Sequence, residues 1–109
     1  MIGKEPNATP DCPVEAALEV MGGKWKCLIL RQLTGETLRF NELRRAMPGV
    51  TQRMLTKQLR ELESHEVISR KIYPEVPPRV EYAITEYGLT LVSILEAMHD
   101  WGQTHLQKR

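Results

Sequence analysis

The spacing of apolar residues changes from a helical to an alternating pattern near residue 67. Within residues 51–65, leucines stand at i, i+4 and i+7, a spacing that places them on one face of an α-helix. Residues 67–73 and 79–85 alternate instead and are rich in β-branched and aromatic types, which is typical of strands. Three prolines lie between these two runs and belong to a loop, because proline cannot donate to a strand ladder. The pattern therefore predicts a helix followed directly by a β-hairpin with a stiff tip.

Two helical segments are predicted near the start of the chain. Cys12-Pro13 opens the first, since proline is favoured at the first helical position, and Gly22-Gly23 ends it. A second apolar stripe at helical spacing runs through residues 25–33 and stops near Gly35. These two helices supply apolar surface against which the later elements can pack.

Two further helices are predicted, one before and one after the helix of residues 51–65 and its hairpin. A short one is expected over residues 40–47, with Asn41 as its N-cap and Pro48-Gly49 as the turn that ends it. Thr85 is expected to cap a last helix that runs over residues 86–105. A short helix, a tight turn, a second helix and a hairpin together make a winged helix-turn-helix. The predicted fold is therefore mainly α with a small β-hairpin, ending in a C-terminal dimerisation helix.

Length and composition fit one globular domain. The chain has 109 residues, of which 41% are hydrophobic and 27% charged, as in ordinary globular proteins. We expect a flexible N-terminal arm at residues 1–11, where few residues are apolar, and a single domain at residues 12–109. No apolar run approaches the roughly 20 residues of a membrane span, and no signal peptide is recognised. Two cysteines make no disulfide framework, so a cytoplasmic location is expected.

Charge is distributed unevenly along the chain. The net charge is +1, but residues 24–79 carry twelve Lys or Arg against six acidic residues, and the two ends are acidic. Binding follows local potential more than total charge, so the basic middle is compatible with a nucleic-acid partner. A chance partition of charge in a small protein is the alternative.

The helix that precedes the hairpin has a polar, basic face opposite its leucines. Arg and Gln can form paired hydrogen bonds with base edges, while Lys and Thr suit phosphates. Since the N-terminal part of the second helix contacts bases in helix-turn-helix proteins, we expect Gln52, Arg53 and Thr56 to read bases. Lys57 and Arg60 are expected to contact phosphate. The alternative is an ordinary solvated face.

Additional basic residues lie in the hairpin and near the short helix. Arg70, Lys71 and Arg79 are placed to contact phosphates or enter a minor groove. Arg39 and Asn41 are candidates for further DNA contacts at the start of the short helix. An ordinary charged surface hairpin is the alternative.

Five short motifs occur in this order: Cys12-Pro13-Val14, Gly22-Gly23-Lys24-Trp25, Arg39-Phe40-Asn41-Glu42-Leu43, Arg53-Met54-Leu55 and Pro77-Pro78-Arg79-Val80-Glu81-Tyr82. Their order and spacing over residues 12–109 resemble the HxlR-type family of bacterial winged helix-turn-helix transcriptional regulators. The resemblance implies a dimeric, DNA-binding protein without enzymatic activity, and we expect it to repress rather than activate. It places the recognition helix at Thr51–Ser64 and the wing at Arg70–Arg79.

The resemblance also draws attention to Cys12. It implies that a cysteine at this position responds, in some members, to oxidants or to electrophiles such as quinones and aldehydes. The N-terminus of a helix favours a thiolate, although the neighbouring Asp11 opposes it. An inert capping cysteine is the alternative, and any disulfide partner of Cys12 stays open. Cys27 is expected to fill space in the core.

The first and last predicted helices carry more apolar residues than one core-facing stripe needs. One stripe can pack on the core of the domain, and the other then requires a partner. A two-fold dimer would match the two half-sites of a palindromic operator. The alternative is a small domain that wraps its core with both faces. The expected interface residues are Val14, Leu18, Leu91, Leu95, Met98 and Trp101.

The sequence contains no pattern that indicates an enzyme. The three histidines have no metal-ligand spacing, and no phosphate loop, nucleophile elbow or paired-carboxylate pattern is present. We therefore expect no metal, no cofactor and no membrane partner. The expected partners are duplex DNA, a second copy of the chain and a small-molecule or oxidant inducer. Two alternatives are a winged helix used only for protein–protein contacts and a small thiol enzyme built on Cys12, for which no adjacent base or resolving thiol is present.

Overall fold

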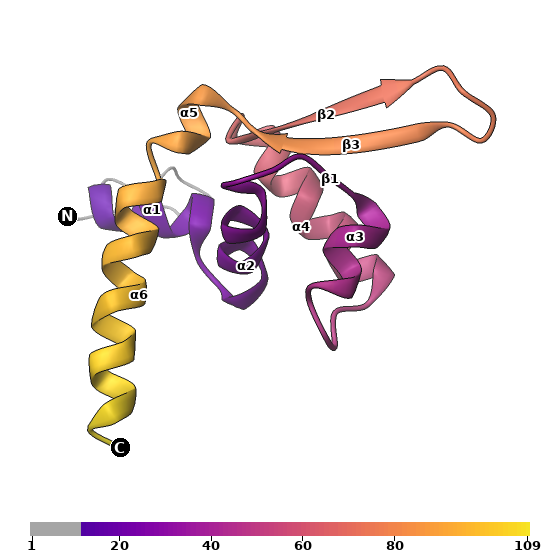
Figure 1. Cartoon of the computed structure of the whole chain (residues 1–109). Helices are drawn as coiled ribbons and strands as arrows, with labels where there is room; N and C mark the ends of the chain where they lie inside the picture. The colour runs from indigo at the N-terminus through magenta and orange to yellow at the C-terminus, as the bar shows by residue number, and fades with distance from the viewer. Residues whose placement is uncertain (1–11) are drawn as a thin grey trace.

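A computed structural model describes residues 12–109, so the predicted arm at residues 1–11 lies outside the described part of the chain. Most helices lie on one side of a small antiparallel sheet, and the predicted winged helix-turn-helix is confirmed (Figure 1). No helix in this range is long and apolar enough to cross a membrane. The elements are α1 (Pro13–Met21), α2 (Lys24–Leu33), β1 (Leu38–Arg39), α3 (Phe40–Arg45), α4 (Gln52–Ser64), β2 (Ile68–Tyr73), β3 (Arg79–Ile84), α5 (Glu86–Leu89) and α6 (Val92–Gln107).

The strands form a three-stranded antiparallel sheet in the order β1-β3-β2. The hairpin of β2 and β3 pairs Ile68 with Ile84 at its base and Tyr73 with Arg79 near its tip. It projects from the helical body on the side away from α6 (Figure 1). The two-residue strand β1, which pairs with β3, was not predicted, because two residues are too short to show an alternating pattern.

The core lies between the helices and the base of the sheet. The three leucines of α4 are buried as predicted, and α4 packs against α2 and β2. Burial of one leucine stripe determines which residues of α4 face outward. The most deeply buried side chains are Met21, Ile29, Leu30, Leu33, Leu43, Met47, Leu55, Leu59, Leu62, Val67 and Ile68.

Both ends of α4 are fixed by local hydrogen bonds. Thr51 is the N-cap, as predicted, and its hydroxyl accepts a hydrogen bond from the Met54 amide at 3.0 Å. Just after α4, Glu66 adopts a positive φ of 63°. The Thr85 hydroxyl donates to the Glu66 carbonyl at 2.7 Å and accepts from the Gly88 amide at 2.9 Å. Thr85 therefore ties the end of the second helix of the motif to the start of α5.

The predicted N-cap of the short helix is wrong by two residues. Arg39 is the N-cap of α3, and Asn41 lies inside the first turn. The Arg39 amide donates to the Glu42 carboxylate at 2.8 Å, as in a capping box. This side-chain contact, together with the pairing of Arg39 in β1, sets the start of α3 earlier than expected.

The predicted single helix over residues 86–105 is also wrong, because α5 and α6 are separate helices. The Thr90 hydroxyl donates to the Tyr87 carbonyl at 2.5 Å, and the Leu91 amide donates to the Gly88 carbonyl at 2.9 Å. A threonine that bonds a nearby carbonyl competes with the helical hydrogen-bond ladder. The chain turns here, and α6 starts in a new direction (Figure 1).

We expect Thr51→Ala to destabilise the fold by about 1 kcal/mol, because the Met54 amide loses its acceptor. For a domain of this size the melting temperature should fall by about 4–8 °C. Thr37→Ala is the matched control, since Thr37 is exposed and its hydroxyl makes no hydrogen bond within residues 12–109. Thermal denaturation followed by circular dichroism measures both variants. Equal melting temperatures for the two variants would contradict the capping role.

Candidate nucleic-acid interface

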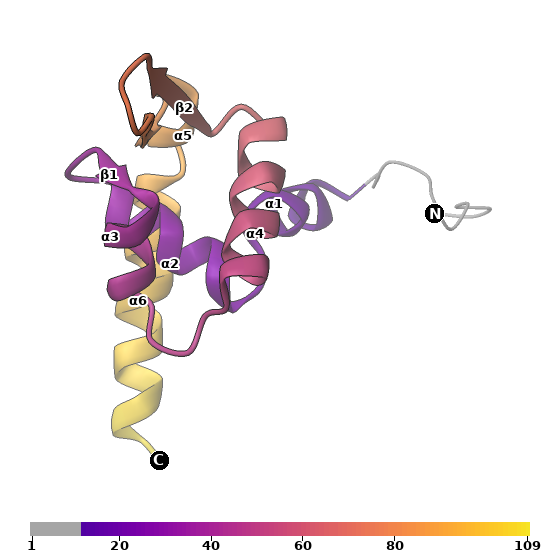
Figure 2. The same cartoon turned by 90° about the vertical axis from the view of Figure 1, so that its right-hand side faces the viewer.

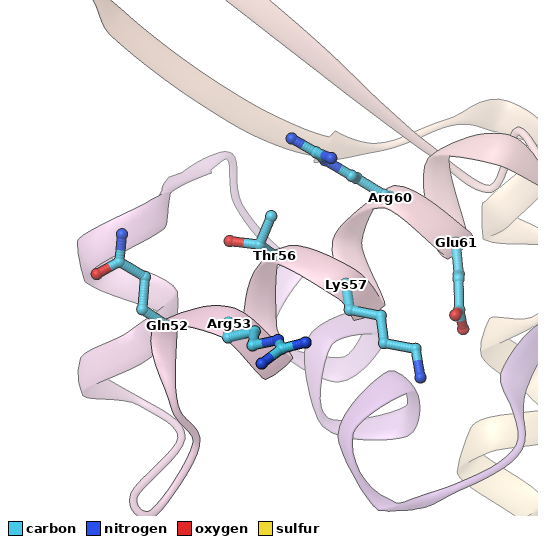
Figure 3. Close-up of a pocket in the computed structure, with 6 residues that line it drawn as sticks. All are labelled: Gln52, Arg53, Thr56, Lys57, Arg60 and Glu61. Atoms are coloured by element: carbon cyan, nitrogen blue, oxygen red, sulfur yellow. The ribbon is translucent and has the colours of Figure 1, made fainter.

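The outer face of α4 forms a continuous polar surface. Six of its side chains line one open hollow and project away from the buried leucines (Figure 3). Within residues 12–109, none of the four cationic or amide side chains among them forms an ion pair with another residue, and all four are exposed. Their donors are therefore free to meet an external acceptor. The residues of the hollow are Gln52, Arg53, Thr56, Lys57, Arg60 and Glu61.

Glu61 is the acidic residue of this hollow, and it has a cationic partner on α2. Lys26 Nζ lies 2.7 Å from Glu61 Oε1, with 12% of the Lys26 side chain and 40% of the Glu61 side chain exposed. The hydrogen bond from Lys26 lowers the pKa of the Glu61 carboxyl, so this group carries its negative charge at neutral pH. Sequence reasoning missed this pair, because only the fold brings α2 beside the third turn of α4.

The start of α3 and the tip of the hairpin face one another across a groove. Arg39 and Asn41 are exposed and line it from the α3 side, while Pro78 and Arg79 line it from the hairpin. The groove has a volume of about 460 Å³. The structure thus brings Arg79 close to Arg39 and Asn41, two other predicted DNA-contacting residues that are far from it in sequence.

Arg70 and Lys71 point to opposite faces of the hairpin, because successive strand residues alternate. Arg70 faces α4, and its Nε lies 3.5 Å from Glu63 Oε2 in an exposed ion pair. Lys71 lies opposite Glu81 in the strand register, and its Nζ is 4.9 Å from the centre of the Tyr73 ring. Both predicted contact residues therefore remain at the surface, but each already has a weak partner.

Arg79 is held more firmly than a free contact residue would be. Its guanidinium carbon lies 4.0 Å from the centre of the Tyr73 ring, a cation–π contact across the hairpin. Its nitrogens also lie 3.5 Å from Glu75 and 3.7 Å from Glu81. Only 30% of the side chain is exposed. These contacts indicate that Arg79 stiffens the hairpin, and its predicted DNA contact stays a prediction.

The HxlR-like helix-turn-helix family model matches residues 20–109, which includes α2, the helix-turn-helix, the hairpin and α6. The chain belongs to the HxlR-like helix-turn-helix family. The HTH-type transcriptional regulator YtcD of Bacillus subtilis (strain 168) is 55% identical over 95 residues, which cover 87% of this chain and 75% of YtcD. The crystal structure of ytcD has a TM-score of 0.83 and 53% identity, covering 88% of this chain and 98% of that one.

Two further solved regulators, HypR and YodB, have the same fold. The redox regulator HypR in its reduced form has a TM-score of 0.85 and 46% identity over 90% of this chain and all (100%) of that chain. The transcriptional regulator YodB of B. subtilis, in its reduced form, has a TM-score of 0.73 and 36% identity over 83% of this chain and 89% of that chain. The relatives are named as transcriptional regulators, so the predictions of a helix-turn-helix transcriptional regulator and of a non-enzymatic protein are confirmed.

Both cysteines of this HxlR-like protein are free thiols and are half-buried. Cys12 is the N-cap of α1, and its side chain makes no capping hydrogen bond. Cys27 packs against the core, and its Sγ donates to the Met21 carbonyl at 3.0 Å. Burial raises the pKa of the Cys27 thiol, so this group is less reactive than an ordinary thiol at neutral pH. Within residues 12–109, no group of His, Cys, Asp and Glu side chains could hold a metal ion.

The predicted dimer residues divide into two groups. Val14 and Leu18 on α1, and Met98 and Trp101 on α6, are exposed. Leu95, in contrast, belongs to the core of the domain, with 5% exposure. Leu91 is half-buried against the same core, so only part of its side chain reaches the surface. Ile94 and Leu106 are also exposed on α6 and were not predicted. The C-terminal half of α6 extends beyond the rest of the body (Figure 2).

Proposed function

We propose that this regulator is a cytoplasmic, homodimeric repressor that binds a palindromic operator in duplex DNA. The observation that carries the proposal is the outer face of α4, where cationic and amide side chains stand in one row without internal ion pairs. Cations that neutralise phosphates release the counterions of DNA, and unpaired cations do so without first giving up a partner. Each α4 would lie in the major groove of one half-site.

The position of each residue along α4 supports a division of roles. Gln52 and Arg53 occupy the first turn, which enters a major groove most deeply, and Thr56 follows one turn later. We assign these three residues to base edges. Lys57 and Arg60 lie further along the helix, where the groove wall brings phosphates within reach.

The remaining predicted contacts would bind the DNA backbone beside α4. Arg39 and Asn41, at the groove between α3 and the hairpin, suit a phosphate strand. Arg70 and Lys71 can each exchange an exposed partner for phosphate, since exposed ion pairs contribute at most about 1 kcal/mol. The hairpin would then act as the wing beside the recognition helix.

Arg53→Ala and Lys57→Ala should weaken DNA binding in different ways. Loss of Arg53 should cost about 1–3 kcal/mol at the preferred duplex and blur sequence preference. Lys57→Ala should weaken all duplexes alike and reduce the slope of log K against log[salt] by about one. The measurement is fluorescence anisotropy over a salt series, with a duplex selected by the wild-type protein from a randomised pool and with a mixed-sequence duplex. For a dimer with about six to eight phosphate contacts, the wild-type slope should be about −5 to −7.

A wild-type slope near zero would exclude DNA as the partner and would favour a winged helix used for protein–protein contacts. Equal losses for Arg53→Ala and Lys57→Ala on both duplexes would exclude only the assigned roles of the two side chains.

The proposed dimer interface uses the exposed apolar surfaces of α1 and α6. Trp101 is 69% exposed and stacks on His105 with ring centres 5.0 Å apart. A large aromatic side chain left in water gains by burial in an interface, and such side chains often dominate binding energy. The extension of α6 beyond the body leaves Met98, Trp101 and Leu106 exposed among residues 12–109.

Trp101→Ala should convert dimers to monomers, with a loss of at least about 2 kcal/mol in dimer stability. Ile72→Ala is the control, because Ile72 is also an exposed apolar residue, at 58%, and lies on β2, away from α6. Sedimentation velocity at several concentrations distinguishes the two species. If Trp101→Ala and Ile72→Ala sediment alike as dimers, the interface lies elsewhere.

We further propose that oxidants or electrophiles regulate the protein through Cys12. HypR is named a redox regulator, and a structure of diamide-treated YodB is known. Cys12 is half-buried at the N-terminus of α1, next to the exposed Val14 of the proposed interface. A modification there would alter how the two subunits place their recognition helices. The disulfide partner could be a small thiol, Cys27 or the partner subunit's Cys12.

Diamide should weaken binding to the selected duplex in wild type but not in Cys12→Ser. Diamide accepts two electrons and two protons as two thiols form a disulfide, so dithiothreitol should restore binding. Cys27→Ser is the matched control and separates the possible partners, because it stays sensitive unless Cys27 is the second thiol. Anisotropy gives the affinity, and mass spectrometry identifies the thiols consumed. Equal sensitivity of wild type and Cys12→Ser would exclude Cys12 as the sensor.

A further inference from the structure

The ion pair between Lys26 and Glu61 connects α2 to the DNA-facing surface of α4. Lys26 lies in the first turn of α2, and its aliphatic stem and amine are almost wholly covered. Its Nζ is 2.7 Å from Glu61 Oε1, a short, charge-assisted contact. Glu61 also lines the hollow of Gln52, Arg53, Thr56, Lys57 and Arg60 (Figure 3). A residue of α2 thus controls the charge of the recognition surface.

Glu61 has a second possible cationic partner on its own helix. Lys57 precedes it by four residues, and side chains at this spacing are neighbours on a helix surface. The two side chains extend in the same direction from α4 (Figure 3). Lys57 contributes to the electrostatic field at Glu61, but Lys26 makes the hydrogen bond. The carboxylate is therefore occupied by Lys26, and Lys57 keeps its donors free.

We infer that Lys26 is a positioning residue for DNA binding, which holds the Glu61 carboxylate and so keeps Lys57 available for phosphate. Without Lys26, the carboxylate would recruit Lys57 and would also present an uncompensated negative charge to the DNA backbone. Both effects weaken binding without any contact between Lys26 and DNA. The inference rests on the proposed DNA-binding function of α4.

Four variants separate this role from a general loss of charge or of folding. Lys26→Met keeps most of the aliphatic stem and removes the cation. Lys24→Met removes the same charge two residues earlier, where Lys24 is exposed and contacts the Trp25 ring but no carboxylate of residues 12–109. Glu61→Gln removes the charge that Lys26 holds. The double variant Lys26→Met/Glu61→Gln removes both members of the pair.

Binding is measured by anisotropy over a salt series, with the duplex selected by the wild-type protein and with a mixed-sequence duplex. Lys26→Met should bind both duplexes on the order of fivefold more weakly than Lys24→Met, with a salt slope reduced by about one, as expected for the loss of one phosphate contact. Glu61→Gln should bind at least as tightly as wild type. The double variant should recover to within about twofold of Glu61→Gln, because Lys57 is then free again.

Three results would overturn the inference. Equal binding by Lys26→Met and Lys24→Met would show that the pair has no effect on DNA affinity. A double variant that is folded by circular dichroism but binds as weakly as Lys26→Met would show that Lys26 acts only through the structure of α2. Weakened binding by Glu61→Gln would give Glu61 a favourable role that the inference denies, and this variant decides the matter if Lys26→Met does not fold. If wild type itself shows no salt-dependent DNA binding, the proposed function fails first.

Discussion

Burial of the leucine stripe of α4 is the constraint on which the recognition surface depends. Leu55, Leu59 and Leu62 have essentially no solvent exposure and pack into the core beside α2 and β2. Replacing such a residue with alanine typically costs about 2–5 kcal/mol, so α4 cannot rotate about its axis without a large loss of stability. With 3.6 residues per turn, fixing the buried face also fixes the outer face. The core therefore selects Gln52, Arg53 and the other residues of the hollow for display.

The cationic side chains of α4 and those of the hairpin differ in whether they have partners within the protein. The cations of α4 have no ion-pair partners within residues 12–109, whereas Arg70 and Arg79 of the hairpin do. The exposed pair of Arg70 and Glu63 is weak enough to exchange for phosphate. Arg79 is different, because loss of its contacts to Tyr73, Glu75 and Glu81 would have to be offset by one phosphate contact. Electrostatic affinity should therefore come mainly from α4, and the hairpin should contribute a rigid shape.

Elements with a clear local pattern were predictable from sequence, and elements set by tertiary contacts were not. The leucine spacing predicted α4 and its outer face, and the alternating runs with intervening prolines predicted the hairpin. Strand β1 depends on pairing with β3, and the break before α6 depends on hydroxyl and amide contacts around Thr90. In both cases, contacts with residues that are neighbours only in the folded structure override the local secondary-structure propensity.

In the candidate site, too, some features follow from the local sequence pattern and others depend on tertiary contacts. The residue types of α4 and their helical positions predicted the membership of its hollow, with Glu61 as the one member whose role was not foreseen. The partners of those residues lie on other elements, as with Lys26 on α2, and no periodicity reports them. Leu95 was predicted at the dimer interface but lies in the core of the domain. When a helix is apolar on two faces, its sequence does not indicate which face packs against the core. The sequence thus predicted which residues lie on this surface of α4, but it did not predict their ion-pair partners.

Helix α2 is one element through which a change at the ends of the chain can reach α4, and α1 also packs against α4 directly. It packs against both α4 and α6, and Lys26 joins it to the hollow on the outer face of α4. Its covalent link to α1 passes through Gly22-Gly23, and Gly23 has a φ of 86°, a conformation that favours glycine. The non-covalent link is stiffer, because Met21 is buried and its carbonyl accepts the Cys27 thiol. A displacement of α1 would therefore reach α4 both through this packed contact with α2 and through the direct packing of α1 on α4. Only about 1–3 kcal/mol of difference between two placements of α2 would change DNA affinity by about 5–150-fold.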